Sequence, residues 1–397
     1  MSIKHFTNSS LLILLLAAQP ALSELEFSGY ASYEARWFPN DAQFSQQLHG
    51  VQNSLVIEPE WIVENGDHQV SFIPFARLDA RDDDRTHADI REAYWLYIQD
   101  QWELLVGFNR EFWGVTESRH LVNVLNQIDQ VENIDEEDYL GQAMINLSIQ
   151  QDFGRFSFYI LPLFRERTFA SNDGRLRAAW VVDEDQAEYD SSAEQWHTDL
   201  ALRYAHYIGN WDVGASYFYG TGREPTLRLS SDATKLIPYY DIINQIGLDI
   251  QYTNEEWLWK FEGIIREGQG DTFAATVFGF EYTFFQFRNS DADFGVLVEH
   301  LYDDRDSIGT PITVLENDLF LGTRYTFNDI QDTSLLAGGI IDLEDESYSL
   351  RLEAERRIGD SFKVGLESQL FTNSRDDSLT AAFKDDDFIQ LSISKYF

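Results

Sequence analysis

The sequence predicts an all-β fold, a transmembrane antiparallel β-barrel of about 18 strands, or about 16 if two weak strands are miscounted. Three observations support it. Apolar and polar residues alternate over segments of roughly ten residues, short and long connectors take turns between these segments, and the chain ends on an aromatic residue, Phe397. Alternation with a period of two places successive side chains on opposite faces of a strand.

The C-terminal segment shows this alternation most clearly. One face is apolar and the other is polar or carries tyrosine. The apolar face holds Ile389, Leu391, Ile393 and Phe397, and the other face holds Gln390, Ser392, Ser394 and Tyr396. A repeat that stops on a terminal aromatic residue is typical of bacterial outer-membrane barrels, so Phe397 is predicted to be the signal read by the barrel-assembly machinery. Lys395 departs from this pattern, in which an apolar or aromatic residue is preferred.

Residues 1–23 predict a secretory signal peptide. Lys4 precedes a short apolar core at 11–16, and the small residues Ala21 and Ser23 allow cleavage before Glu24. The core is too short to span a bilayer as an anchoring helix, and no later stretch approaches the ~18 apolar residues that a membrane helix needs. Residues 24–397 are therefore predicted to form one exported barrel, with no plug domain and no internal repeat.

The composition fits this reading. The chain has no cysteine, so rigidity has to come from a source other than disulfides, and a closed barrel provides it by pairing every backbone group. The 10 Trp, 19 Tyr and 29 Phe suit the aromatic girdles of a membrane barrel. The net charge of −39 excludes nucleic acid as a partner. It is compatible with a cation-favouring pore, with a salt-rich habitat, or with loops that are simply well solvated.

Two kinds of connector alternate along the chain. The short ones contain the Gly, Asn and Asp that tight hairpins require, and the long ones are mostly acidic. The short connectors lie at 64–67, 99–101, 152–154, 208–210, 253–256, 288–291, 328–332 and 358–360, and the long ones near 38–50, 81–89, 114–142, 168–194, 220–240, 267–272, 303–315, 343–347 and 372–387. Such a layout predicts turns on the periplasmic side and loops outside the cell.

The charged faces of the strands are predicted to line a wet lumen. Between 257 and 266, for example, Trp257 and Trp259 oppose Lys260 and Glu262. A charge facing lipid at the midplane would cost roughly 2–4 kcal/mol. The candidate pore-lining residues are Glu26, Glu34, Arg36, Glu58, Glu60, Arg77, Asp79, Asn109, Glu111, Lys260, Glu262, Arg266, Arg324, Arg351, Glu353, Glu355, Lys363 and Glu367. Because Arg and Glu are mixed on adjacent strands, we expect an electric field across the lumen.

The segment 114–141 mixes apolar residues such as Leu121 and Val122 with acidic residues such as Asp129 and Glu132. A purely solvated loop does not need the apolar set. Two interpretations stay open: the segment folds into the barrel and narrows the pore, or it forms a cap on the neighbouring loops outside. The inward alternative places it against the strand with Asn109 and Glu111.

The same region contains Val106–Gly114, followed by Glu117-Ser118, Asn123–Asn126 and Ile128-Asp129. This succession resembles a pattern of the alginate-export-like and related families of proteobacterial outer-membrane channel proteins, over about a tenth of the chain. Phe108-Asn109 and Gln127–Asp129 stand where those families often have Gly-Arg-Gln and Asn-Pro-x-Asp. The resemblance implies a porin-like outer-membrane barrel and no particular substrate.

No catalytic motif is present. The sequence has no nucleophile elbow, phosphate loop, dinucleotide fingerprint or zinc helix motif, and its eight His are scattered. A membrane-embedded hydrolase using His300 and a loop serine is the weakest alternative. The acidic runs 81–85, 135–138 and 385–387 lack the ligand spacing and central Gly of a calcium loop. We therefore predict no catalytic residues, no cofactor and no metal site. The less favoured interpretation of the acidic runs is that they bind divalent ions that bridge to lipopolysaccharide.

These features together predict a channel in the cell outer membrane, monomeric or homotrimeric, that passes small solutes down a gradient with a modest cation preference. Its expected partners are outer-membrane lipid and lipopolysaccharide, the barrel-assembly machinery and the solutes. The alternative is a surface receptor or structural barrel whose lumen is sealed, because Arg and Glu ladders would serve a sealed lumen equally well.

Overall fold

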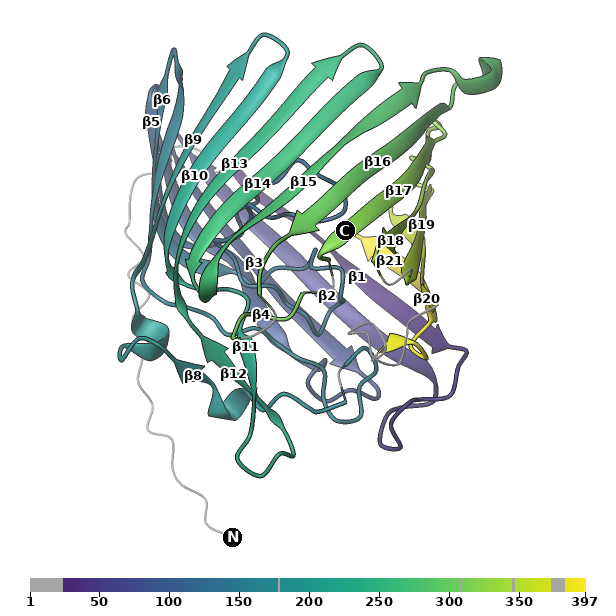
Figure 1. Ribbon diagram of the computed structural model, residues 1–397. Helices are drawn as coiled ribbons and strands as arrows, with labels where there is room; N and C mark the ends of the chain where they lie inside the picture. The colour runs from purple at the N-terminus through teal and green to yellow at the C-terminus, as the bar shows by residue number, and fades with distance from the viewer. Residues whose placement is uncertain (1–23, 178, 307–308, 314, 345–346, 373–382) are drawn as a thin grey trace.

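The computed structural model describes residues 24–397 except 178, 307–308, 314, 345–346 and 373–382. The chain forms a closed barrel of 18 antiparallel strands, which confirms the predicted fold and strand number (Figure 1). The barrel closes where β1 (Glu24–Phe38) pairs with β21 (Phe388–Tyr396) on one side and with β2 (Gly50–Asn65) on the other. The predicted signal peptide lies outside the described residues.

The other barrel strands each pair with their neighbours along the wall. They are β3 (His68–Asp79), β4 (Ala88–Ile98), β5 (Trp102–Asn109), β6 (Gln142–Gln151), β7 (Gly154–Leu161), β9 (Asp199–Ile208), β10 (Trp211–Thr221), β13 (Ile242–Asn254), β14 (Trp257–Gly268), β15 (Gly270–Phe284), β16 (Asp293–Asp303), β17 (Asn317–Thr326), β18 (Ser334–Asp342), β19 (Tyr348–Ile358) and β20 (Phe362–Thr372).

Short turns gather at one end of the barrel and long loops at the other, as predicted (Figure 1). The loop end holds a small sheet of β8 (Glu188–Tyr189), β11 (Thr226–Leu229) and β12 (Leu236–Tyr240). Helix is confined to three 3-10 turns among the described residues: η1 (Glu184–Gln186), η2 (Glu194–Trp196) and η3 (Phe287–Asn289). No helix in this part of the chain is long and apolar enough to cross a membrane.

The prediction of a long loop near 267–272 is wrong. The connector near 267–272 is a single residue, Gln269, between β14 and β15. Gly268 and Gly270 have positive φ angles of 104° and 70°, which let the chain reverse within this short distance. The polar residues of 267–272 suggested a solvated loop, but the Gln269 side chain is buried, and its amide donates to the Glu224 carbonyl oxygen at 2.7 Å.

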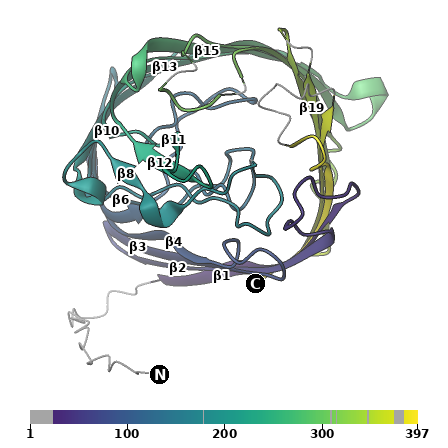
Figure 2. The same ribbon diagram turned by 60° about the horizontal axis from the view of Figure 1, so that its bottom comes forward.

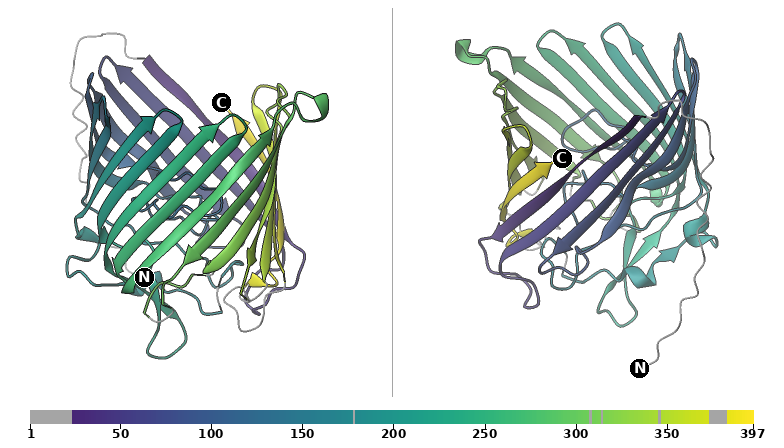
Figure 3. Two further views of the ribbon diagram at one scale, coloured as in Figure 1. Left: turned by 45° about the horizontal axis from the view of Figure 1, so that its top comes forward. Right: turned by 180° about the vertical axis from the view of Figure 1, so that it is seen from behind.

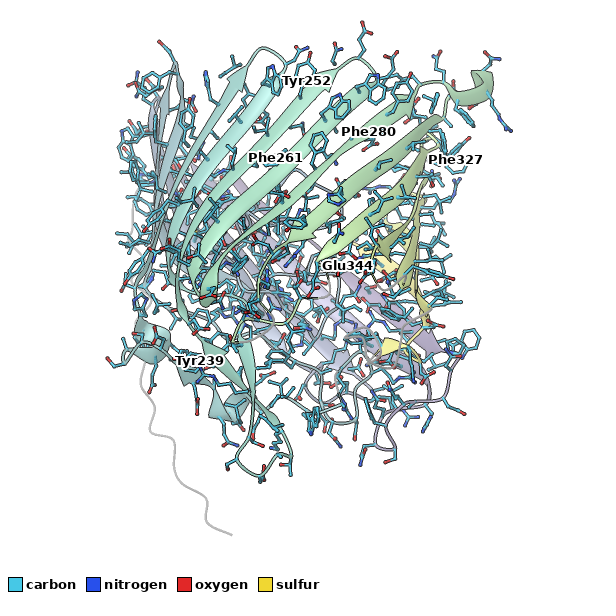
Figure 4. All side chains as sticks on the ribbon, viewed as in Figure 1. Tyr239, Tyr252, Phe261, Phe280, Phe327 and Glu344 are labelled. Atoms are coloured by element: carbon cyan, nitrogen blue, oxygen red, sulfur yellow. The ribbon has the colours of Figure 1, made fainter. Side chains whose placement is uncertain are left out.

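The outer face of the barrel is apolar, with an aromatic band toward the turn end. Exposed apolar side chains on β1 include Leu25, Phe27 and Trp37. Rings on neighbouring strands pack against one another near the turns, as Trp257 and Tyr282 do edge to face with centroids 4.7 Å apart. Figure 4 labels three further members of this band, Tyr252, Phe280 and Phe327. An apolar exterior with an aromatic band is what a lipid environment requires.

The C-terminal residue completes the closure beside β1, which Figure 3 shows from behind. The Phe397 amide donates to the Gly29 carbonyl oxygen at 3.1 Å, and its ring lies 5.4 Å from the Phe27 ring. Gly29 has no side chain that would crowd this ring, since a Cβ there would lie 3.2 Å from Phe397 Cε2. Lys395 faces outward, where its ammonium lies 4.7 Å from the Phe362 ring centroid and contacts the Ser361 hydroxyl.

We predict that Phe397→Ala slows barrel assembly, because it removes the ring that seats the closing strand on β1. The lost ring pair also lowers the free energy of unfolding by about 0.5–1.5 kcal/mol, in addition to the lost apolar burial. Insertion into lipid vesicles, followed by heat-modifiable gel mobility, measures assembly. Phe327→Ala is the control, because it removes a ring that packs edge to face with Tyr325, away from the closing strand. Equal assembly rates for the two variants would contradict the closing-strand role.

Candidate functional site in the barrel lumen

The whole connector between β5 and β6, residues 110–141, lies inside the barrel, where the inward alternative places residues 114–141 (Figure 2). That it narrows a pore stays a prediction. Val122 and Leu125 are completely buried, and they belong to a cluster with the lumen-facing Phe218 and Ile243 of the wall. Asn126 ties the neck of the segment to the strands, because its amide nitrogen donates to the Asn109 carbonyl oxygen at 3.0 Å. The apolar residues of the segment are therefore buried against the wall rather than in an external cap.

Two buried glutamates of the wall hold the first half of the segment. The carboxylate of Glu262 on β14 accepts hydrogen bonds from the backbone N–H groups of Val115, Thr116 and Val122 at 2.8–3.2 Å, and from the Thr116 hydroxyl at 2.7 Å. Such charge-assisted bonds are the strong class of hydrogen bond. They satisfy donors that a coil segment buried in a lumen would otherwise leave unpaired.

Glu299 on β16 repeats this arrangement one step further along the segment. Its two oxygens accept from the Glu117 and Ser118 backbone N–H groups at 2.8 Å and from the Ser118 hydroxyl at 2.6 Å. Glu117 then places its own carboxylate near two cations of the wall, 2.8 Å from Arg324 and 3.5 Å from Lys260.

A cluster of ion pairs surrounds Glu224 at the loop end of the same wall. The Glu224 carboxylate lies 2.9 Å from Arg305, 3.0 Å from Arg266 and 3.6 Å from Arg119 of the segment. Burial disfavours the charged form of Glu224, but the charges of Arg305, Arg266 and Arg119 outweigh it and hold the pKa of this carboxyl well below its usual range.

The second half of the segment binds the opposite wall. Asp129 lies 2.7 Å from Arg91 of β4, and Glu132 accepts two hydrogen bonds from Arg77 Nε at 2.8 and 2.9 Å. Arg77 also binds Glu34 of β1 at 2.6 Å, so one guanidinium joins the segment to two strands. Burial opposes ionisation of Asp129, yet hydrogen bonding to His87 and the charge of Arg91 lower its pKa to about 2.

The segment also reaches the strands that close the barrel. Asp135 lies 2.7 Å from Arg351 of β19, and the Asn133 amide donates to Glu367 of β20 at 2.8 Å. Three acidic residues of the segment, Asp129, Glu132 and Asp135, are thus paired with arginines of the wall.

A bulge in β4 supplies Arg91. Pairing between β3 and β4 shifts so that Pro74 opposes Ile90 while Ile73 opposes Glu92, which leaves Arg91 as the extra residue. Proline cannot donate to the ladder, which suits it to such a shift. Both charged residues then reach lumen partners: Arg91 binds Asp129, and Glu92 lies 3.6 Å from Arg110 of the segment.

A polar cavity of about 230 Å³ lies between the segment and the wall of β1–β4, β20 and β21. Its charged lining contains five arginines and five acidic residues. They are Arg36, Arg77, Arg85, Arg91, Arg110, Glu34, Glu58, Glu132, Asp138 and Glu367. Polar cavities of this size hold water.

The arginines of this cavity are not equally engaged. Arg77 is bound on both sides, and Arg85 donates to Asp79 at 2.8 Å and to the Val131 carbonyl oxygen at 3.0 Å. Arg36 differs, because its Nε donates to the neutral Gln390 amide at 2.8 Å. Gln390 in turn donates to Glu367 at 3.4 Å, so a neutral amide separates this cation from the nearest carboxylate along the wall.

The predicted lining residues occupy different settings. Arg77, Asn109, Lys260, Glu262 and Arg266 are buried at contacts with the segment or with the Glu224 cluster. Asp79, which is partly buried, binds Arg85. Glu111 accepts from the Asn109 amide at 3.2 Å, and burial and the nearby charge of Glu103 raise its pKa to about 6 despite the opposing charge of Arg155.

Several other predicted residues lie on β17, β19 and β20 and pair with acidic side chains. Arg324 contacts Glu117, Arg351 contacts Asp135 and Glu353, and Lys363 contacts Glu355. Which of all these residues face the conducting path stays a prediction. Sequence reasoning missed several anchors, which are Arg85, His87, Arg91, Glu224, Glu299, Asp303 and Arg305.

Three side chains could in principle hold a metal ion, because His87, Asp129 and Glu132 bring ligand atoms within 4.8 Å of one another. Both carboxylates are already bound by arginine, and a cation placed here would lie beside two guanidinium groups. We therefore interpret the cluster as an ion-pair network that fixes the segment.

No family model matches the sequence, and no match is found among curated proteins. Among solved structures, the chain is similar to a BenF-like porin from Pseudomonas fluorescens Pf-5, with a TM-score of 0.54, 9% identity, and coverage of 94% of this chain and 98% of that one. It is also similar to Pseudomonas aeruginosa OccK9 (OpdG), with a TM-score of 0.53, 10% identity and coverage of 94% and 97%. It is similar as well to OccK11 (OpdR) of the same species, with a TM-score of 0.52, 11% identity, and coverage of 94% of this chain and 96% of that one. The comparisons therefore show a porin-like barrel fold, and they give no support to the alginate-export-like resemblance.

We predict that Glu262→Ala releases the first half of the segment while the barrel stays closed. The change leaves three backbone N–H groups without their acceptor, and unsatisfied buried polar groups cost about 1–3 kcal/mol each. Limited proteolysis should then cut within 114–122, where the parent resists. Glu267→Ala is the control, because Glu267 is an exposed residue on the same strand. Identical cleavage of the two variants would contradict the anchoring role of Glu262.

Proposed function

We propose that this protein is an outer-membrane channel that passes small solutes, with segment 110–141 as its constriction. The observation that supports this best is the polar cavity between the segment and the β1–β4 wall. It lies inside a barrel whose fold is that of known porins. The partial resemblance of residues 106–129 to channel families agrees with the same class of function. The turn end would face the periplasm, as in other bacterial barrels.

A sealed barrel is the second candidate, and a specific observation favours it. The segment is bound to both walls, through Glu262 and Glu299 on one side and through Arg77 and Arg91 on the other. Such a crossing could close the lumen as well as narrow it. Planar-bilayer recordings separate the candidates: steady open-channel currents support the channel, and their absence supports a receptor or structural barrel.

The ion selectivity that we propose depends on where acidic residues of the lumen lack a balancing arginine or lysine. The cavity is lined by five arginines and five acidic residues, but burial raises the pKa of Asp138 to about 8, so this carboxyl is largely uncharged at neutral pH. The constriction itself therefore does not favour cations. Toward the turn end, the lumen face of β1 and β2 adds Glu26 and Glu60, and β4 adds Glu92. Together with the net charge of −39, these groups would concentrate cations at the mouths. We propose a modest cation preference on this basis.

The location, the partners and the oligomeric state that we propose rest on the composition of the chain and on its fold class. The channel would lie in the cell outer membrane, in contact with lipopolysaccharide, after delivery by the barrel-assembly machinery through Phe397. It would act as a monomer or a homotrimer. No catalytic step is proposed.

We predict a reversal potential that indicates modest cation preference at low salt, and a smaller preference at about 1 M salt, where the Debye length falls to about 3 Å. Joint substitution Glu26→Gln, Glu60→Gln and Glu92→Gln should reduce the preference, since it neutralises the acidic turn-side lumen. Glu64→Gln, at the exposed end of β2, is the control. A clear anion preference of the parent at low salt would contradict the proposal.

We predict that shortening the segment raises conductance and admits larger solutes. Asn109 and Gln142 are paired across β5 and β6, so an Asn-Gly turn can replace residues 110–141 without changing the strand register. Liposome swelling with sugars of increasing size measures the exclusion limit. A shortened barrel that folds and discriminates as the parent does would show that the segment is not the constriction.

A further inference from the structure

His87 lies in the contact between the second half of the segment and the β3–β4 wall. Its Nδ1 is 3.2 Å from the Arg85 carbonyl oxygen. Its Nε2 is 3.2 Å from Asp129 Oδ2 and 3.5 Å from Glu132 Oε1. All three neighbours are acceptors. A neutral imidazole has one N–H, so it can donate on only one side, whereas an imidazolium donates on both. The geometry therefore selects the protonated ring.

We propose that His87 is a positioning residue that holds residues 129–138 against the wall only while its imidazole carries a charge, so that the constriction loosens as the pH rises. The inference rests on the proposed channel function and names how that same site is regulated.

The groups around His87 leave it as the titrating member of the contact. Arg91 binds Asp129 and Arg77 binds Glu132, and guanidinium groups keep their charge at any physiological pH. The Thr168 hydroxyl donates to Asp129 Oδ1 at 2.8 Å, and the Phe75 ring centroid is 5.4 Å from that of His87. Among these groups, the imidazole is the one that changes charge near neutral pH.

The pKa of His87 agrees with the geometry. Partial burial favours the neutral ring, but the hydrogen bond and charge of Asp129, the charge of Glu132 and the Arg85 carbonyl outweigh it and raise the pKa. A group with a raised pKa in the bound state stabilises that state fully below its free value, near 6.5 for histidine. That contribution is lost as the pH rises through the raised value, so loosening belongs to the alkaline side.

Two acidic residues of the segment titrate in the same range. Burial and neighbouring carboxylates raise the pKa of Glu137 to about 7 and that of Asp138 to about 8. Their deprotonation adds negative charge beside Glu132 and Asp135, so it acts in the same direction as loss of the His87 proton. Any test has to separate these contributions.

The test records single-channel conductance and current noise of the full-length folded protein between about pH 6 and pH 9, in about 1 M KCl so that distant charges are screened. For the parent, we expect quiet openings at low pH and a rise in conductance and noise as His87 deprotonates. The ratio of released to bound segment should change by up to tenfold for each unit by which the bound pKa exceeds the free value.

Variants assign the transition to His87. His87→Arg keeps a cation at all pH values, so most of the rise should disappear. His87→Gln lacks the charge, so it should be noisy even at about pH 6. His206→Gln on β9, away from the contact, should keep the parent profile. The double variant Glu137→Gln/Asp138→Asn should also keep most of the rise, and its loss there would overturn the assignment.

Two further outcomes separate this inference from the channel itself. If the folded parent passes no current, the proposed channel function fails. If the parent conducts and His87→Gln has the same pH profile, the channel stands and the role of His87 is overturned. Should the His87 variants fail to fold, as judged by heat-modifiable gel mobility, NMR titration of the parent decides: a His87 imidazole pKa at or below about 6.5 overturns the proposal.

Discussion

The position of the lumen segment depends on the two buried carboxylates that bind its backbone N–H groups. In the first half of the segment, the N–H groups of residues 115–118 and of Val122 would lose their acceptors without Glu262 and Glu299. Their charges would be costly to bury if they had no donors to bind. The N–H groups need acceptors and the buried carboxylates need donors, so each stabilises the other. The segment is thereby fixed to the wall at two successive points.

The fold could be predicted because its signals are local and repeated. Alternation along each strand, Gly- and Asn-rich turns and the terminal Phe397 are visible in short stretches of sequence. The exception at 267–272 is instructive. Its polar residues are the same ones a solvated loop uses, and only the buried contacts of Gln269 with distant residues show that the connector is a tight turn.

The site was less predictable for the same physical reason. Candidate lining residues were chosen by their face on a strand, so Glu262 and Arg77 were named before their partners were known. Arg91 was missed because the bulge at Pro74 breaks the period of two. Glu224 and His87 lie in connectors, where no periodicity places a side chain. Their roles depend on contacts with residues of the segment that no sequence spacing indicates.

The position of the segment along the chain affects when its contacts can form during folding. It follows β5, yet its contacts include Arg351 on β19 and Glu367 on β20, which are more than two hundred residues later. Contacts at such sequence separation form late, since loop-closure entropy is lost before they stabilise the chain. The contacts of the segment with β3 and β4, which precede it, and with β14 and β16 can form earlier. The second half of the segment is therefore fully fixed only when the barrel is nearly complete, and an assembly intermediate without β19 and β20 would hold residues 133–135 more loosely.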